Sequence, residues 1–167
     1  MSDEGGPSAG PRKSRFRVRA ADAGDDAFIL ALVERFVAFE LPAWRKRNDC
    51  ANGIRRDLKR ALENPPPGEA LFIAEDENGE RTGFLRLQKT RDFFSGRPNC
   101  HVSDLAVAPG RDGQGIGSTL LDHAQAWAKK QRCALITLAV FPGNARALAL
   151  YERMGYGPDL LRMAKPA

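Results

Sequence analysis

Four glycines lie within eight residues at one junction of the chain, in the segment GRDGQGIG (residues 110–117). A run of strand-forming residues precedes this segment, and a helical pattern follows it at once. Glycine reaches positive φ angles and lets the backbone approach a ligand closely. The unpaired N–H groups at the start of the following helix form an anion site, which the helix dipole strengthens. The junction therefore predicts binding of a phosphate-bearing ligand.

Two well-known phosphate loops do not match this segment. A Walker loop ends in Gly-Lys-Ser/Thr, whereas Gly117-Ser118 has no lysine before its hydroxyl. The dinucleotide fingerprint G-x-G-x-x-G has unevenly spaced glycines, whereas Gly113, Gly115 and Gly117 are evenly spaced. Neither a P-loop nor a Rossmann dinucleotide site is therefore expected.

A second segment, NARALALYERMGY (residues 144–156), combines helical spacing with groups that can reach a ligand. Asn144 suits the N-cap of a helix, and Gly155 suits the position just after its end. Ala147 and Tyr151 share one helical face. The small side chain of Ala147 leaves room for a ligand, and the Tyr151 hydroxyl projects nearby.

The remaining pattern predicts the elements that position these two segments. Strands are expected at residues 16–19, 71–75, 81–88, 100–107 and 135–140, with at most one short strand within 156–165. Helices are expected from Asp25 or Asp26 up to Leu41-Pro42, at 52–62, after the glycine-rich junction and at 144–155. An antiparallel meander, turning at Asn78-Gly79, is followed by a strand–helix–strand unit. This order implies an α/β fold in which a mixed sheet carries helices on both faces, with the apolar run 135–140 as a central strand.

Length and composition are those of an ordinary globular domain. The 167 residues are 43% hydrophobic and 28% charged. Residues 1–13, rich in Gly, Pro and Ser, are expected to be a disordered tail, and residues 14–167 a single domain. No apolar run is long enough to span a membrane, and no signal-peptide pattern opens the chain, so no membrane association is expected.

Cysteine usage and charge narrow the class further. Cys50, Cys100 and Cys133 are widely spaced without a Cys-x-x-Cys pair, which favours a reduced cytoplasmic protein and argues against a structural metal. The net charge is +5, but acidic residues interrupt the basic ones, and no basic stripe with interleaved aromatic residues appears. The excess charge is therefore expected to attract an anionic small ligand, and no nucleic acid partner is expected.

Both segments resemble motifs of the GNAT superfamily of N-acetyltransferases. The glycine-rich junction is similar to the acetyl-CoA pyrophosphate loop, Arg/Gln-x-x-Gly-x-Gly/Ala, which here reads Asp112-Gly113-Gln114-Gly115-Ile116-Gly117. Residues 144–156 look like the second motif, Asn-x-x-Ala-x-x-x-Tyr-x-x-x-Gly-Phe/Tyr. Asp112 departs from the family, which has Arg or Gln there, although Arg111 is adjacent. Because a carboxylate repels a pyrophosphate, we expect Asp112 to point away and backbone amides to bind the ligand.

The resemblance implies the GNAT fold and direct transfer of acetyl from acetyl-CoA to a primary amine of a small molecule or protein. It implies that Tyr151 protonates the leaving thiolate and that Asn144 contacts the pantetheine arm. The residues that it assigns to the cofactor are Leu105, Ala106, Val107, Arg111, Asp112, Gly113, Gln114, Gly115, Ile116, Gly117, Ser118, Asn144 and Ala147. An acetyl-CoA-binding module with weak or no catalysis is the alternative, and a homodimer is open because GNAT domains often dimerise.

The general base is not carried over by the resemblance. Some relatives have a glutamate on the strand before the loop, at the position of Ser103. The local candidates are Asp104, Ser103 and His101: the ordinary pKa of His101 suits the task, and Asp104 could act through water if its pKa is raised. Strand alternation without a bulge would place His101 and Ser103 on one face and Asp104 on the other. A water-relayed or substrate-assisted route is an equal alternative.

The acceptor pocket is expected between the first two helices and the polar connection at residues 89–99. Its candidate residues are Phe39, Trp44 and Phe93, which lie among several arginines. Aromatic groups beside arginines disfavour a polycationic acceptor. They suit an amine that also carries a carboxylate or an apolar group.

Overall fold

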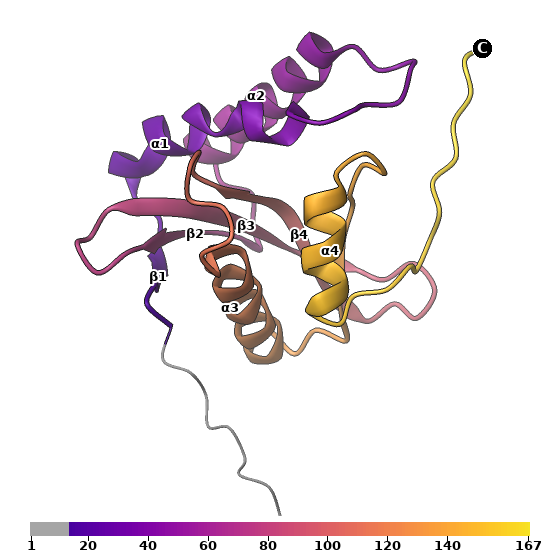
Figure 1. The fold of residues 1–167 in the computed structure, drawn as a ribbon. Helices are drawn as coiled ribbons and strands as arrows, with labels where there is room; N and C mark the ends of the chain where they lie inside the picture. Colours follow the sequence, from indigo (N-terminus) through magenta and orange to yellow (C-terminus); the bar gives the residue numbers. More distant parts are fainter. Residues whose placement is uncertain (1–13) are drawn as a thin grey trace, which may run out of the picture.

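One five-stranded sheet forms the centre of the computed structural model, which describes residues 14–167 (Figure 1). Its strands are β1 (Arg17–Ala20), β2 (Glu69–Glu75), β3 (Arg81–Arg91), β4 (Pro98–Val107) and β5 (Leu135–Leu138). They lie in the order β1-β2-β3-β4-β5, and every neighbouring pair is antiparallel except β4 and β5. The predicted mixed sheet is therefore confirmed. The predicted tail at residues 1–13 lies outside the described residues.

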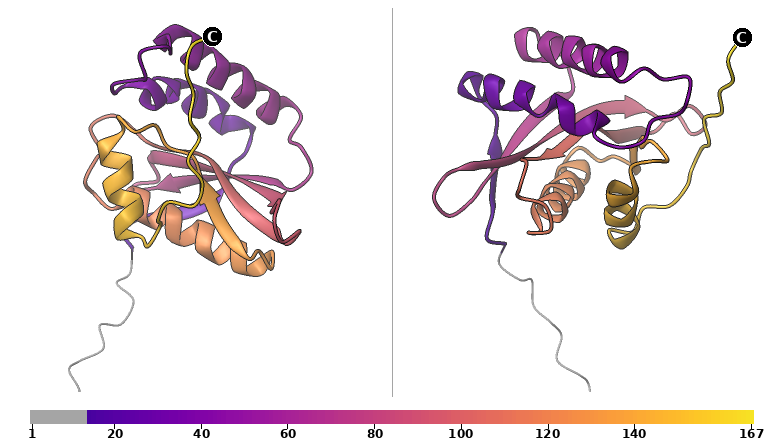
Figure 2. Two further views of the ribbon diagram at one scale, coloured as in Figure 1. Left: turned by 90° about the vertical axis from the view of Figure 1, so that its right-hand side faces the viewer. Right: turned by 45° about the horizontal axis from the view of Figure 1, so that its top comes forward.

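Helices cover both faces of the sheet, as predicted (Figures 1 and 2). One face carries the first layer of helices: the 3-10 helix η1 (Ala23–Asp25), α1 (Asp26–Ala31), the 3-10 helix η2 (Val33–Val37) and α2 (Arg47–Glu63). The other face carries α3 (Ile116–Lys130) and α4 (Ala145–Arg153). Within residues 14–167, no helix is both long enough and apolar enough to cross a membrane.

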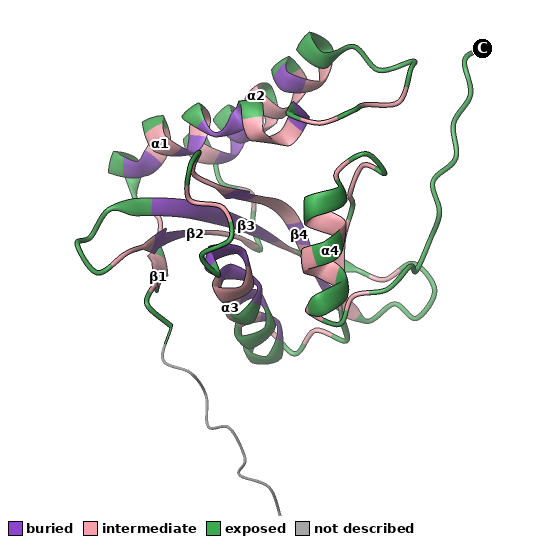
Figure 3. Cartoon of the chain, viewed as in Figure 1, coloured by how far each residue is buried: buried purple, intermediate pink, exposed green. Residues whose placement is uncertain are grey.

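The hydrophobic core is divided by the sheet into two clusters. Successive side chains of a strand point to opposite faces, so Phe84 packs under α1 and α2 while Leu85 packs under α3. Leu58 of α2 is buried in the same cluster as Phe84, and Leu120 of α3 is buried in the same cluster as Leu85. Figure 3 shows this burial along β3 and on the inward sides of the helices. The two layers of helices therefore fold onto a shared sheet through separate contacts.

The predicted first helix is broken into the short elements η1, α1 and η2. Asp25 occupies the N-cap position of α1, as predicted, but its side chain makes no capping hydrogen bond there; the side-chain cap is Asp22, at the start of η1. Asp25 is instead fully buried and bonded to Arg19 at 2.7 Å and to Arg81 at 2.6 Å. A buried carboxylate needs such paired cations, and these bonds fix the segment to β1 and β3.

Strand β5 is an edge strand of the described sheet, so the prediction of a central strand was wrong. Its residues are only partly covered, and residues 157–167 form no strand that could pair with its outer edge. A continuous apolar run occurs both in central strands and in edge strands that helices cover, so the sequence pattern does not distinguish the two. The β3–β4 connection is also shorter than predicted, because strand pairing continues to Arg91 and resumes at Pro98.

A β-bulge in β4 coincides with the end of β5. Val102 pairs with Leu87 on one side and with Leu138 on the other. Asp104 pairs with Arg86, so Ser103 has no partner in either neighbouring strand. Bulges of this kind bend a strand and redirect its side chains. Beyond Val102, β4 follows β3 alone.

Gly143 allows the loop between β5 and α4 to touch the loop between η2 and α2. A Cβ at this position would lie 2.0 Å from the backbone oxygen of Glu40, and no side-chain rotation would relieve the clash. The next residue, Asn144, caps α4 as predicted, because its side chain accepts a hydrogen bond from the Ala147 N–H at 3.2 Å. The close approach at Gly143 therefore holds the start of α4 against the first layer of helices.

Replacing Gly143 by alanine is expected to destabilise the protein, because the two backbones must move apart. The usual cost of overpacking is about 1–3 kcal/mol. Thermal denaturation measures the loss. Gly157→Ala is the matched control, since a Cβ there meets nothing within 4 Å. An unchanged melting temperature for Gly143→Ala would show that the contact with Glu40 does not constrain the loop.

Candidate active site

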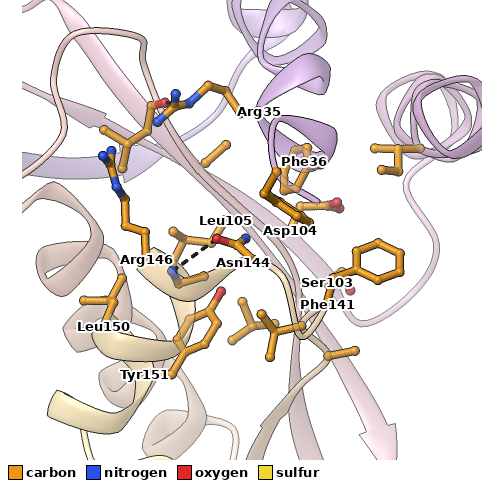
Figure 4. A pocket seen from close by; sticks show the side chains of 18 of the residues that line it. Arg35, Phe36, Ser103, Asp104, Leu105, Phe141, Asn144, Arg146, Leu150 and Tyr151 are labelled. Carbon is orange, nitrogen blue, oxygen red and sulfur yellow. Dashed lines mark hydrogen bonds between the residues drawn. The ribbon is translucent and has the colours of Figure 1, made fainter. Parts of the chain in front are cut away.

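A cavity of about 320 Å³ lies where β4 and β5 separate (Figure 4). β5 pairs with β4 only along Asn99–Val102, whereas β4 continues to Val107, so residues 103–107 present a backbone edge that no strand pairs, and on it the Val107 oxygen accepts from Arg35. Helix α4, η2 and residues 139–141 supply the other walls. The predicted site residues that line the cavity are Phe39, Asp104, Leu105, Ala106, Val107, Asp112, Asn144, Ala147 and Tyr151.

Asp104 is directed by the bulge toward a buried arginine. The side chain of Arg86 is only 4% exposed, and its Nη1 lies 3.1 Å from Asp104 Oδ2. The same guanidinium is bonded to Asp57 of α2 at 2.6 Å and to Glu69 of β2 at 2.9 Å. Because Ser103 is the bulged residue, Asp104 and His101 share the face of the sheet under α2. The arrangement expected for a regular strand is therefore not found.

Three carboxylates surround the guanidinium of Arg86, and Asp57 is also paired with Arg60, so the cluster keeps an excess of one negative charge. Burial raises the pKa of Asp104 to about 6, and the nearby carboxylates of Asp57 and Glu69 add to the rise, while Arg86 opposes it. A carboxylate with such a pKa is ionised at neutral pH and is a stronger base than an ordinary aspartate. Asp104 borders the cavity and can therefore accept a proton there.

Tyr151 borders the same cavity from α4. Its ring packs edge-on to Tyr156, with the centroids 5.9 Å apart, and its hydroxyl points toward the interior of the cavity (Figure 4). Burial raises the pKa of Tyr151, so the phenol stays protonated at neutral pH. A protonated phenol facing a cavity can donate a proton to a leaving group.

The N-terminus of α3 has the features of an anion site. Its N-cap is Gly115, at φ 86°, which offers no side-chain hydrogen bond, and the first turn holds no acidic residue. The first N–H groups of the helix, at Ile116, Gly117 and Ser118, have no partner within the helix. Gly117 also permits close helix packing, because a Cβ there would lie 2.7 Å from Leu150. The predicted anion-binding amides are therefore available.

Asp112 is expected to point away from a bound pyrophosphate, and this stays a prediction; in the structure, ion pairs hold its side chain. Its carboxylate borders the cavity and bridges two arginines from opposite layers, Arg35 and Arg146, each at 2.6 Å. The hydrogen bonds from Arg146 and Arg35 hold the pKa of Asp112 below its ordinary value. Arg35 also donates to the Val107 oxygen at 3.1 Å. The acid at the loop position is therefore compensated by two cations, and the group carries a net positive charge.

Ten predicted site residues do not line this cavity, and six of them belong to the glycine-rich loop and the start of α3: Gly113, Gln114, Gly115, Ile116, Gly117 and Ser118. His101 is bonded to Thr137 Oγ1 at 2.9 Å, and burial lowers its pKa. Arg111 pairs with acidic residues of the β2–β3 turn. Phe93 is 92% exposed at the tip of the β3–β4 turn. Trp44 lines a neighbouring cavity instead.

Arg35, Phe141, Arg146 and Leu150 line the cavity and were not predicted. Phe36 and Ile54 also line it and lie in the first two helices, where the acceptor pocket was expected, and Ser103 was a candidate for the base. An acid in a phosphate loop needs a compensating cation, so Asp112 was a signal for Arg146, which lies two residues after Asn144. The first-layer residues gave no comparable signal, because only tertiary packing brings η2 and α2 over β4. Within residues 14–167, no three His, Cys, Asp or Glu side chains are grouped to hold a metal ion.

Comparison with known proteins identifies the family. Residues 33–156 match the model of the acetyltransferase (GNAT) family. An uncharacterised N-acetyltransferase of Bacillus subtilis, YhfO, is 32% identical over 142 residues, covering 85% of this chain and 90% of the relative. A bovine thialysine N-epsilon-acetyltransferase is 30% identical over 145 residues, covering 83% of this chain and 82% of the relative.

The architecture agrees with solved structures as well. A putative acetyl transferase from Pyrococcus furiosus superimposes with a TM-score of 0.74 at 24% identity, covering 91% of this chain and 99% of that chain. At that identity, the similarity establishes the fold. Together with the family match, it shows that the chain belongs to the GNAT family of acetyltransferases, enzymes that use acetyl-CoA.

Substitutions at Asp112 and Arg146 are expected to change CoA affinity in opposite directions. Asp112→Asn removes a negative charge beside the phosphate loop, so acetyl-CoA should bind more tightly by about 1 kcal/mol, or roughly fivefold. Arg146→Gln removes a cation and should weaken binding by a similar factor. Isothermal titration calorimetry at two salt concentrations measures both effects, and the differences should shrink at high salt. Weaker binding by Asp112→Asn would contradict this electrostatic account.

Proposed function

We propose that this protein transfers acetyl from acetyl-CoA to a primary amine in the cavity between β4 and α4, with Asp104 as the base and Tyr151 as the acid. One observation carries the proposal: the free edge of residues 103–107 leads to the uncapped N-terminus of α3. The pantetheine arm of CoA carries amide groups that suit an open strand edge. The pyrophosphate of CoA suits the unpaired amides of α3.

The chain's own residues divide the work of the transfer. The backbone at residues 105–107 and Asn144 orient the pantetheine arm, so that the thioester lies between Asp104 and Tyr151. The amine nitrogen forms a bond to the thioester carbon, and the carbon–sulfur bond breaks. Asp104 takes the proton lost by the amine, directly or through water, and Tyr151 gives its proton to the departing sulfur. Holding both reactants in one cavity supplies the positional part of the catalysis.

The acceptor side of the cavity is the side under the first layer of helices. Phe36, Phe39 and Ile54 form an apolar wall there, and Asp104 lies at its end. The bovine relative is named for a small amine with an ε-amino group, which supports a small primary amine as the acceptor. The free cysteines suit a reducing compartment, so we place the activity in the cytoplasm.

The role of Asp104 predicts an acidic limb in the pH profile. Activity should fall as the pH drops through about 6, because protonation of Asp104 removes the base. Asp104→Asn should lower kcat about a hundredfold or more and should abolish this limb. The measurement is the rate of CoA thiol release against pH at saturating acetyl-CoA.

Thermal stability provides the control for Asp104→Asn. The pKa of Asp104 is raised on folding, so its ionised form opposes folding above about pH 6, and the cost disappears as the pH falls toward 3.8. The variant should therefore be at least as stable as the native protein at neutral pH, since Arg86 keeps its bonds to Asp57 and Glu69. A large drop in melting temperature would assign Asp104 a structural role instead.

Tyr151→Phe is expected to separate catalysis from binding. The variant should lose about a hundredfold in kcat, because no proton reaches the thiolate, while its Kd for acetyl-CoA stays unchanged.

Thermal denaturation measures binding of acetyl-CoA separately. At acetyl-CoA near 100 times its Kd, binding to the folded state raises the free energy of unfolding by about 2.7 kcal/mol, which corresponds to a melting-temperature rise of roughly 5–10 °C. Native protein and variant should show the same rise. No rise with acetyl-CoA, or a rise matched by ATP, would refute the proposed cosubstrate.

A further inference from the structure

A second cavity, of about 400 Å³, opens beside the first, at the start of α2. The two cavities share Ile54 and Phe141 in their walls, so they lie side by side, and we refer to the pair as the recess. Trp44 lies in the second cavity with its side chain half exposed. A long acceptor whose amine reaches Asp104 therefore has room for its other end here.

The charged side chains that line the second cavity form no ion pair with the rest of the described chain. Arg45, Lys46 and Asp49 line it, and within residues 14–167 none of the three takes part in an ion pair. The arginines nearby on α2 are different: Arg47 donates to the backbone oxygen of Phe39, and Arg55 pairs with an acidic residue of η2. Two cations and one carboxylate give the cavity a net positive charge.

Gly53 indicates that space in this cavity matters more than helix stability. It lies in the interior of α2, where glycine costs about 1 kcal/mol relative to alanine. A Cβ at this position would meet only the tip of Arg56, at 3.9 Å, so packing does not require glycine. The residue faces the second cavity, and its missing side chain enlarges that cavity.

The two ends of the recess have opposite charge. Around Asp104, three carboxylates face the guanidinium of Arg86, and one of them, Asp57, is also paired with Arg60, so one negative charge is left over and this end attracts an ammonium group. Around Arg45 and Lys46, cations are in excess, so this end repels a second ammonium and attracts an anion. A molecule that complements both ends carries an amine at one end and a carboxylate at the other.

We infer that the acceptor is an amino carboxylate, whose carboxylate binds Arg45 and Lys46 beside Trp44 while its distal primary amine lies at Asp104. The inference rests on the proposed function, because it assigns the acceptor of that transfer. Charge-assisted hydrogen bonds hold the carboxylate. Trp44 and Ile54 contact the methylene chain between the two groups, and Gly53 leaves the room that the carboxylate end needs.

Three acceptors that share one aminopentyl chain and differ only in the group at its far end test this inference. They are 6-aminohexanoate, hexylamine and 1,5-diaminopentane, with the analogues that have two fewer methylenes as a shorter series. The order of kcat/KM should be carboxylate, then methyl, then ammonium, with about a tenfold loss at each step. The full-length protein and the thiol-release assay are used throughout. Equal turnover of the diamine and the amino acid would overturn the inference and leave the acetyltransferase function intact.

Paired charge variants locate the preference. In the double variant Arg45→Gln/Lys46→Gln, the ratio of 6-aminohexanoate to hexylamine turnover should fall toward one. The matched control, Lys129→Gln/Lys130→Gln, removes the same charge from exposed residues at the end of α3 and should keep the native ratio. A fall of the same size in both double variants would assign the preference to the overall field of the protein and overturn the subsite.

Filling the second cavity gives an independent test. Gly53→Leu should raise KM for 6-aminohexanoate without changing the Kd for acetyl-CoA. Gly53→Ala is the control for the helix: it should raise the melting temperature, because alanine is the better helix former. Equal KM values for Gly53→Leu and the native protein would show that the acceptor does not enter this cavity.

Binding is also followed without turnover, through Trp44 fluorescence. Carboxylates of the panel should change the emission of the native protein at millimolar concentration, and hexylamine should change it less. Trp44→Phe should remove the signal. If no amine released CoA thiol, the proposed function would fail, while this signal would still report on the subsite. If no carboxylate changed the emission and none was acetylated, the inference itself would fail.

Discussion

The separation of β4 from β5 is the constraint on which the rest of the site depends. Val102 is the last residue of β4 that pairs on both sides, and the bulge at Ser103 follows at once. A strand edge that would otherwise be satisfied by a neighbour is thereby left open inside the protein. Unpaired backbone groups are costly when buried, so an open edge that faces a cavity is a binding surface for a ligand with its own amides. The same bulge turns Asp104 toward Arg86.

Two charge clusters of opposite composition lie on either side of this opening. In one, three carboxylates surround the buried guanidinium of Arg86. In the other, Asp112 bridges the two cations Arg35 and Arg146. Both clusters connect elements that are distant in sequence, so each contributes to the tertiary fold. Their surplus charges differ in sign, which favours a cationic amine at one end of the cavity and a polyanion at the other.

The parts of the site that the sequence predicted are those with local physical causes. Glycines that need positive φ, the Asn144 cap and the phase of Tyr151 on its helix depend on residues a few positions apart, and the structure places them as expected. The Arg86 cluster joins β2, β3, β4 and α2, and no spacing of residues along the chain predicts such a contact. For the same reason Trp44 and Phe93, chosen by residue type alone, lie outside the cavity beside Asp104. Of the predicted pocket aromatics, Phe39 lines it.

The division of the core explains why the family motifs leave the acceptor undetermined. Both motifs lie in the second half of the chain, in the loop before α3 and in α4. The acceptor wall comes from η2 and α2, which pack on the opposite face through a separate cluster. Apart from Arg35, which donates to the Val107 oxygen, changes in that first layer alter the shape and charge of the recess without disturbing the strand edge or the α3 N-terminus. In the function proposed here, recognition of the acceptor therefore depends on residues such as Arg45, Lys46 and Gly53, which lie in α2 or directly before it.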